Sequence, residues 1–264
     1  MKFNLKLFVL VGVLAGFRDV CGTEKKGENK DYDGFIVAGL TDDEKKELEA
    51  AVREKRVIKA VYKTEVAGLS SIIHGKFKYK LSSILVWDGK EVKKVEAKNL
   101  ASDIFSIGYV MSEKVDHTVY FIFNDELLNS TANMFFMCSR LISADFRCFN
   151  TSNVKDMSYM FYMCSSLTEL NLSLFDTSKV ENMLCMFYEC SALKELDLSN
   201  FNTSKVTNMA DMFDLCTSLN LVFLPLKDVD IKKRCICCVY GPVLWNNHEV
   251  GGLNPNIVQL KKSE

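Results

Sequence analysis

The sequence predicts an α/β repeat protein, in which a short solenoid follows a small α+β region. Three observations predict it: a motif that recurs every 26 residues between about 121 and 226, mixed helix-like and strand-like segments over residues 34–120, and an export-like N-terminus. The 264 residues are 48% hydrophobic and 25% charged, enough for one large domain or two small ones. A formal net charge of -1 provides no general attraction to nucleic acid or anionic membranes.

Residues 1–22 have the order of a secretory signal. Lys2 and Lys6 precede an uncharged apolar run at 7–17, which is too short to span a bilayer. We therefore expect an exported protein, secreted or displayed on the cell surface. Residues 23–33 are polar and charged, and they predict an exposed tether.

The end of this signal leaves two processing routes open. The segment resembles a bacterial lipoprotein signal, in which Leu-Ala-Gly precedes a lipid-bearing Cys. Here Leu14-Ala15-Gly16 is followed by Phe17, and Cys21 comes four residues later. Cys21 is thus the candidate lipidation residue, which would give the protein its membrane contact. Simple cleavage after Gly22 is the alternative.

Residues 34–120 predict a helix followed by strands. Thr41 and Glu44 form a capping-box pattern at the start of a helix over about 42–54. Apolar or alternating runs predict strands at 57–62, 77–81, 84–87, 92–95, 104–111 and 118–123. Asp88-Gly89 predicts the turn of a hairpin. No chemistry is recognisable in this region.

The repeat is the most specific signal in the chain. The segments 149–154, 175–180 and 201–206 align without gaps at a period of 26 residues. Other positions follow in the same register, among them Met160/Met186/Met212, Phe161/Phe187/Phe213, Cys164/Cys190/Cys216 and Leu172/Leu198/Leu224. A weaker copy begins at Phe123, so there are about four units. The degenerate first unit predicts a capping repeat whose Phe135 has a neighbour on one side only.

The spacing within a unit predicts a coil that turns several corners and points its apolar residues inward. Leu196 and Leu198 alternate as in a short strand, whereas residues 183–190 suit a helical turn. Asp176 and Asn202 are expected to bond nearby backbone groups at corners. A single unit cannot bury its own apolar face, so stacking of units should form the core.

The motif Phe-Asx-Thr-Ser-x-Val-x-x-Met-x-x-Met-Phe-x-x-Cys-x-x-Leu-x-x-Leu-x-Leu resembles the BspA-type leucine-rich repeat, which also occurs in mycoplasma lipoproteins and in surface proteins of some protists. The resemblance covers about two-fifths of the chain and does not include the region before Phe123. It implies a leucine-rich-repeat-type solenoid that is secreted or displayed on a cell surface. Members of the family are associated with adhesion to host proteins or other cells.

The ten cysteines fall into different groups. Cys138, Cys164, Cys190 and Cys216 share one repeat position, and a spacing of 26 residues is not that of a zinc site, so buried structural thiols are expected. Cys235, Cys237 and Cys238 lie beyond the repeats, in a C-terminal cap or tail at 227–264. Three interpretations stay open for these: a soft-metal site, a thiol activated by its basic neighbours, or a disulfide in the cap.

The functional prediction is a non-catalytic binding protein without cofactor or metal. The three His are scattered, and no nucleophile, phosphate-loop or metalloprotease motif is present. The partner is expected to be an extracellular or host-cell protein, not nucleic acid, and no oligomeric state is implied. Outward positions that vary between units are the candidate binding residues: Tyr162, Tyr188, Lys179 and Lys205.

Two rival functions remain. One is a structural surface component without a specific ligand, which an evenly polar surface would favour. The other is an unrecognised enzymatic activity in residues 34–120, which a deep pocket with a strongly perturbed titrating group would favour.

Overall fold

The computed structural model describes residues 40–95, 106–111, 115–124, 127–219 and 221–223, together with the backbone of 244–245 and 248–249. The predicted export signal and tether, with Cys21, lie outside the described residues. So do Cys235, Cys237 and Cys238.

The predicted helix is confirmed as α2 (Asp42–Arg53), and its capping box is present. The backbone N–H of Glu44 donates to Thr41 Oγ1 at 3.3 Å, and the N–H of Thr41 donates to the Glu44 carboxylate at 2.9 Å. These two bonds satisfy donors that the first turn of a helix leaves free. Leu48, Ala51 and Val52 form the buried face of the helix.

In the described part of the chain, six strands precede the repeats: β1 (Val57–Tyr62), β2 (Gly68–Ile73), β3 (Leu81–Trp87), β4 (Val92–Val95), β5 (Ile107–Met111) and β6 (His117–Phe123). The predicted hairpin is confirmed, since β3 pairs with β4 and Asp88 Oδ1 accepts the N–H groups of Lys90 and Glu91. The strand predicted at 77–81 is wrong. A 3₁₀ helix (Gly75–Phe77) and a bond from Lys80 N to Phe77 O turn the chain there. Strand β2 was not predicted.

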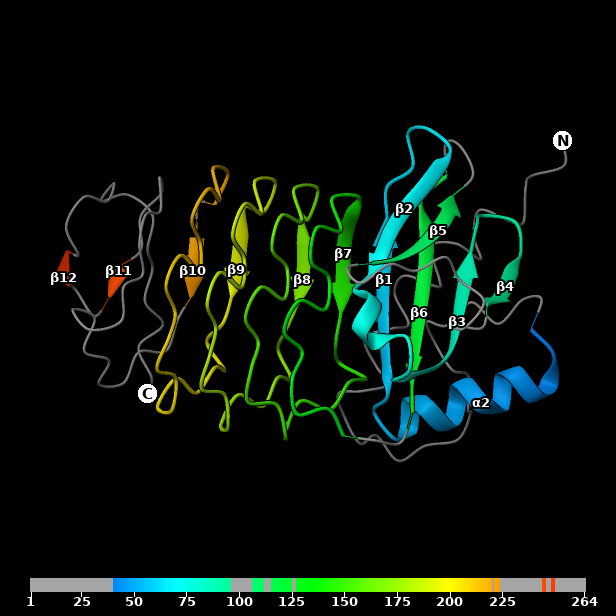
Figure 1. Cartoon of the computed structure of the whole chain (residues 1–264), viewed down its shortest axis with the longest axis horizontal. Coiled ribbons are helices and arrows are strands. Elements are labelled where there is room, and N and C mark those ends of the chain that lie inside the picture. The colour runs from blue at the N-terminus through cyan, green and yellow to red at the C-terminus, as the bar shows by residue number, and fades with distance from the viewer. Residues whose placement is uncertain are drawn as a thin grey trace, which may run out of the picture.

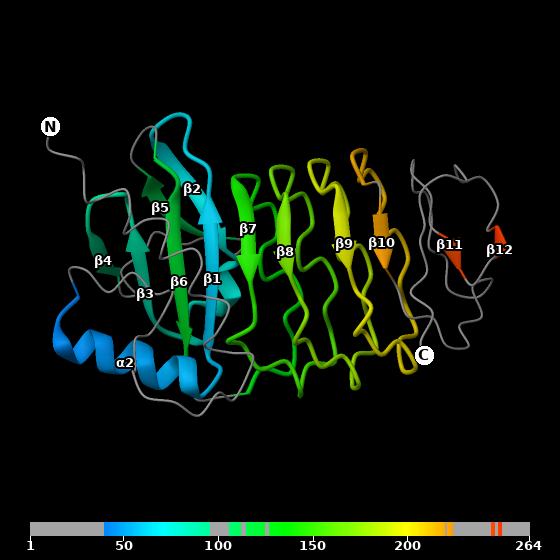
Figure 2. The same cartoon turned by 180° about the vertical axis from the view of Figure 1, so that it is seen from behind.

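The repeats contribute β7 (Leu141–Asp145), β8 (Glu169–Asn171), β9 (Glu195–Asp197) and β10 (Leu221–Phe223). The main sheet has the order β4-β3-β6-β1-β7-β8, so it contains strands from both parts of the chain. Strands β9 and β10 form a parallel pair, β2 and β5 an antiparallel one, and β11 (Leu244–Trp245) pairs with β12 (His248–Glu249). Strands β7 to β10 lie side by side beyond β1 (Figure 1). From behind, β1 and β6 lie in front of β2 and β5 (Figure 2).

Equivalent residues of successive repeats meet, as the 26-residue period predicted. Parallel bridges join Ser130, Asp156, Asn182 and Asn208 in turn. The rings of Phe161, Phe187 and Phe213 stack with centroids 5.6 Å apart at both steps. The predicted burial of one repeated methionine position is confirmed, because Met160, Met186 and Met212 are all fully buried.

The predicted fold class, an α/β leucine-rich-repeat-type solenoid, is nevertheless wrong. The described residues contain a single α-helix, α2, and it lies outside the repeats. Each repeat supplies a short strand and turns. The repeat strands are divided between the main sheet and the separate β9–β10 pair, so they do not close into a solenoid of their own. The described structure is therefore mostly β, and we refer to residues 127–223 as the repeat region.

One apolar core runs from the first strands into the last described repeat. Phe135 shows how the two parts join, because its ring lies 5.9 Å from that of Phe121 in β6 and 5.7 Å from that of Phe161. The expectation that Phe135 has a neighbour on one side only is thus wrong. A smaller cluster forms on the opposite face of the sheet, where α2 covers Val57, Leu85 and Tyr120.

Candidate functional site

One long side of the repeat region is formed by the turn segments 131–138, 157–164, 183–190 and 209–216, which we call the turn face. Its backbone N–H groups donate alternately to carbonyl groups of the next repeat and to carbonyl groups of their own repeat. Those of Tyr159 and Phe161 donate to the next repeat, at Leu184 O (2.8 Å) and Met186 O (2.9 Å). That of Met160 donates back to Met157 O at 3.3 Å. The helical turn predicted at 183–190 is wrong, because half of its donors bond to a neighbouring repeat.

This alternation places two residues of each repeat in the left-handed conformation, with φ between 51° and 60°. Such a backbone costs about 1 to 2 kcal/mol for a residue other than glycine. The residues are Asn133, Met137, Tyr159, Met163, Cys185, Glu189, Asp211 and Leu215. The bonds between repeats offset this strain, and they fix the direction in which each side chain leaves the turn face.

Three aromatic side chains form a ladder on the turn face. The rings of Phe136 and Tyr162 stack at 5.1 Å and 9°, and those of Tyr162 and Tyr188 at 4.8 Å and 11°. Tyr159 meets Tyr162 edge to face at 5.6 Å, and His74 meets Phe136 in the same manner at 6.4 Å. All five side chains are half-buried. The ladder is therefore a rigid aromatic surface with its ring edges toward solvent.

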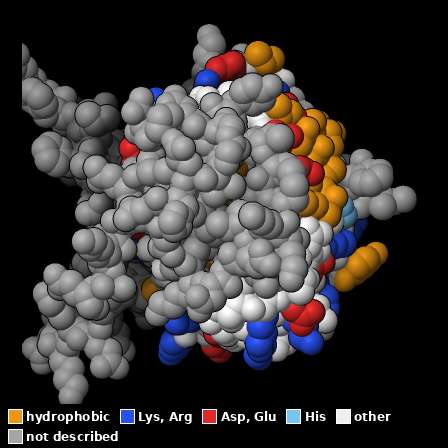
Figure 3. Space-filling view, turned by 90° about the vertical axis from the view of Figure 1, so that its left-hand side faces the viewer, with side chains coloured by type: hydrophobic (Ala, Val, Ile, Leu, Met, Phe, Trp, Pro, Cys, Tyr) orange, Lys and Arg blue, Asp and Glu red, His pale blue; other side chains and the backbone are white. Residues whose placement is uncertain are grey.

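Exposed apolar side chains extend this surface toward β2 and β5. Leu69 and Val110 are cross-strand partners and are 64% and 69% exposed, and Met137 in the first repeat is 53% exposed. Arg140 links the two parts by donating to Val66 O at 3.2 Å. Figure 3 shows hydrophobic side chains gathered along one side of the molecule, with acidic side chains among them. Exposed apolar surface of this kind is characteristic of interaction sites.

The far end of the turn face is acidic. Asp214 follows Tyr188 in the ladder position, while Glu189 and Asp211 occupy left-handed positions. Partial burial, the neighbouring Tyr162 and the carboxylates of Asp214 and Glu189 together raise the pKa of Tyr188. Within the described residues, none of the three carboxylates forms an ion pair.

The structure brings together only part of the residue set predicted from sequence. Tyr162 and Tyr188 are in direct contact on the turn face. Lys179 and Lys205 are exposed at another corner of the repeats, where Lys179 Nζ donates to Asn153 Oδ1 at 3.3 Å. The prediction for Cys21 falls outside the described residues. Sequence reasoning missed Glu189 and Asp211. The position of Glu189 next to Tyr188 in the chain could have identified it, whereas only the stacking of the turns places Asp211 near Tyr159.

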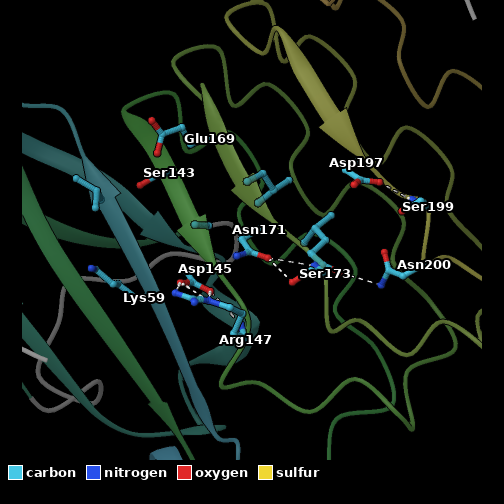
Figure 4. Close-up of a pocket in the computed structure, with 14 residues that line it drawn as sticks. Lys59, Ser143, Asp145, Arg147, Glu169, Asn171, Ser173, Asp197, Ser199 and Asn200 are labelled. Atoms are coloured by element: carbon cyan, nitrogen blue, oxygen red, sulfur yellow. Dashed lines mark hydrogen bonds and ion pairs between the residues drawn. The ribbon is translucent and has the colours of Figure 1, made fainter. Parts of the chain in front are cut away.

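A second candidate site is a groove of about 580 Å³ on the strand side of the repeat region. It crosses β1, β7, β8 and β9, and its labelled lining is polar (Figure 4). Arg147 forms an ion pair with Asp145, with Nη2 2.6 Å from Oδ2, and both side chains are largely buried. Burial lowers the pKa of Lys59, and the Asp145 carboxylate opposes this shift.

Most polar groups of the groove are occupied by the chain itself. Asn171 Oδ1 accepts the backbone N–H of Ser173 at 3.1 Å, and Asp197 Oδ1 accepts that of Ser199 at 2.9 Å. Asn200 Nδ2 donates to Leu172 O and Phe175 O at 3.0 and 3.1 Å. The bonds of Asn200 join neighbouring repeats, whereas those to Asn171 and Asp197 are turn-forming bonds of Asx type. The corner bonds predicted for Asp176 and Asn202 are of the same type and are confirmed, at 2.9 and 3.0 Å.

The cysteines at the repeated position are free, buried thiols, as predicted. Cys164, Cys190 and Cys216 each donate from Sγ to a carbonyl of the preceding repeat, at 2.9 to 3.1 Å. Burial raises the pKa of Cys138 and of Cys216 to about 12, which keeps both protonated. Within the described residues, no group of three or more His, Cys, Asp or Glu side chains is placed to hold a metal ion.

Comparison with known families gives a match over the repeats. Residues 129–233 match the family model described as "Mycoplasma protein of unknown function, DUF285". Over this stretch the chain is similar to that mycoplasma family. The match spans the repeats and leaves out the region of α2 and β1 to β6. Neither the curated proteins nor the solved structures gave a match. None of the helices in the described ranges is long and apolar enough to cross a membrane.

Proposed function

We propose that this chain is an exported, non-enzymatic surface protein with BspA-type repeats, and that its turn face binds another protein. The aromatic ladder of Phe136, Tyr162 and Tyr188 is the observation that carries the proposal. Binding energy at protein interfaces concentrates in a few aromatic or arginine side chains, and tyrosine combines a large apolar ring with a polar edge. The similarity to a mycoplasma family and the export-like N-terminus support the proposed location.

The turn face is better suited to binding than the groove. Its aromatic side chains are already ordered by stacking and by the backbone bonds between repeats, so little conformational entropy remains to be lost on binding. Apolar surface at Leu69, Val110 and Met137 extends the contact area. In the groove, by contrast, a partner would compete with polar bonds that the chain makes to itself.

The test is a double substitution, Tyr162→Ser with Tyr188→Ser, in the mature protein. We expect binding to cultured cells and to immobilised extracellular host proteins to fall at least tenfold. The melting temperature should fall too, because the variant loses three aromatic contacts and each contributes about 0.5 to 1.5 kcal/mol beyond its buried area. Binding is therefore measured at a temperature where the variant is folded. The control variant, Tyr162→Phe with Tyr188→Phe, keeps both rings and should retain most of the binding.

Unchanged binding by the folded serine variant would contradict the turn face as the binding surface. Absence of binding by the wild-type protein to every cell and protein tested would favour the rival role of a structural surface component.

A further inference from the structure

The aromatic ladder stops one repeat before the last described turn. Its ring position holds Phe136, Tyr162 and Tyr188, and then Asp214. The backbone N–H of Glu189 donates to Asp214 O at 2.8 Å, so Asp214 belongs to the next rung. Tyr162 covers one ring face of Tyr188, and the shorter Asp214 stands where the next ring would cover the other. The ladder therefore ends on an aromatic face with a carboxylate beside it.

Two further carboxylates belong to this end of the ladder. Glu189 adjoins Tyr188 in sequence, and Asp211 adds negative charge near Tyr159. Three half-buried carboxylates elsewhere in the described residues have a cation: Glu47 has Lys94, Asp88 has Lys93 and Asp145 has Arg147. Others, such as Glu49 and Asp156, form no ion pair there. The three acids at the end of the ladder have none among the described residues. The grouping of three carboxylates beside an aromatic ring favours a positively charged ligand at this end of the ladder.

We propose that an arginine side chain of the partner protein stacks on the face of Tyr188 that no described ring covers, and that it pairs with Asp214 and Glu189. This inference rests on the proposed function, since it names the partner chemistry that the turn face recognises. A guanidinium is planar, so it can continue the ladder where an aromatic ring is missing. It also carries a full positive charge and up to five donors for carboxylate oxygens.

Other occupants fit this site less well. A lysine ammonium would pair with the carboxylates, but it has no plane with which to continue the stack. An aromatic ring would continue the stack but would leave the half-buried carboxylates without a counter-charge. An anionic lipid surface or a phosphate would be repelled by the three acids.

The test uses the full mature chain with ¹³C-labelled tyrosine rings and a small probe, Nα-acetyl-arginine amide. Binding is followed by NMR through the ring signals of Tyr188, assigned by comparison with Tyr188→Phe. Saturable shifts are expected with this probe. The matched citrulline probe has the same shape and no charge, and it should bind at least tenfold more weakly. The lysine probe should bind at least threefold more weakly.

Two charge-removing variants separate the site from general electrostatics. Asp214→Asn keeps the oxygen that accepts the N–H of Leu215, and it should weaken arginine binding at least fivefold. Glu195→Gln removes the same charge from exposed β9, on the strand side, and should change binding less than twofold. Equal binding of the arginine and citrulline probes, equal losses in the two variants, or an unchanged affinity in Asp214→Asn would overturn the proposal.

The two proposals can fail separately. If the arginine probe binds in an Asp214-dependent manner while the serine variant of the tyrosine pair still binds cells, the arginine site stands and the adhesive turn face fails. If cell binding needs the tyrosines while no arginine probe shifts the Tyr188 signals, the adhesive face stands and the arginine site fails.

Discussion

The two long sides of the repeat region are built from the same repeats but differ in how their surface side chains are ordered. On the strand side, Asn171 and Asp197 are each bonded to the backbone two residues further on. On the turn face, the Tyr162 and Tyr188 rings are ordered by stacking, while Glu189 and Asp211 have no ion-pair partner within the described ranges. A protein can thus use one side to hold its fold and leave the other side available for a partner.

Both sides depend on one core, and this dependence gives the largest expected effect. Phe187→Ala removes a fully buried ring from the stack between Phe161 and Phe213, and it should lower the free energy of unfolding by about 3 to 5 kcal/mol. Phe135→Ala should cost a similar amount, because its ring also lies between two others. Urea unfolding of both variants measures this. A loss below about 1 kcal/mol at Phe187 would mean that the rings contribute little.

The buried cysteines at the repeated position give a second prediction, which concerns their reactivity toward alkylating reagents. With their pKa raised to about 12, Cys138 and Cys216 should have almost no thiolate at pH 8. We expect iodoacetamide to leave the cysteines at the repeated position unmodified in the native protein and to modify them fully in guanidinium chloride. Peptide mass spectrometry reads this out site by site. Rapid native-state modification of Cys190 would show that the repeats open readily.

A variant in the groove should lower stability and leave cell binding unchanged, unlike the substitution of the two tyrosines. Asn200→Ala removes the two bonds that this side chain donates to Leu172 O and Phe175 O. It should destabilise the protein by about 1 to 3 kcal/mol, since each of the two hydrogen bonds typically contributes about 0.5 to 1.5 kcal/mol. Binding to cells should stay at the wild-type level at a temperature well below melting. A loss of binding without a loss of stability would move the interaction site to the groove.

The smallest expected effect is that of Asp214→Asn on stability. The amide oxygen still accepts the N–H of Leu215, and like charge near Glu189 and Asp211 is reduced. The free energy of unfolding should change by less than about 0.5 kcal/mol, as for most surface substitutions. Thermal melts at low and high salt measure it. A large loss would assign Asp214 to the fold, and not to a site for a partner.

The sequence predicted much of this molecule because its repeats leave a strong residue pattern. The 26-residue register identified the buried positions of Met186, Phe187 and Cys190, all of which are fully buried. The Thr41 capping box and the Asp88-Gly89 hairpin were also predictable, since local bonds alone determine them. The fold class was not. The spacing of residues 183–190 resembles a helical turn, but their N–H groups bond partly to the next repeat, which no local pattern reveals.

The candidate site was half predictable for a related reason. Tyr162 and Tyr188 stood out because they occupy an outward repeat position whose residue changes between units, to Asp214 in the third. The two tyrosine rings do meet. Their environment could not be predicted. Left-handed backbone is unusual for side chains such as Tyr159, Cys185 and Glu189, and only the bonds between repeats impose it. Without that backbone, nothing in the sequence places Asp211 near the ladder.

The most direct test of the account compares the two sides of the repeat region in one binding experiment. The turn-face variant carries Tyr162→Ser with Tyr188→Ser, and the groove variant carries Glu169→Gln with Asp197→Asn. Adhesion of each to cultured cells is measured by flow cytometry at a temperature where circular dichroism shows both to be folded. We predict at least a tenfold loss for the turn-face variant and less than a twofold change for the groove variant. Wild-type adhesion by the turn-face variant, or an equal loss in the groove variant, would contradict the account.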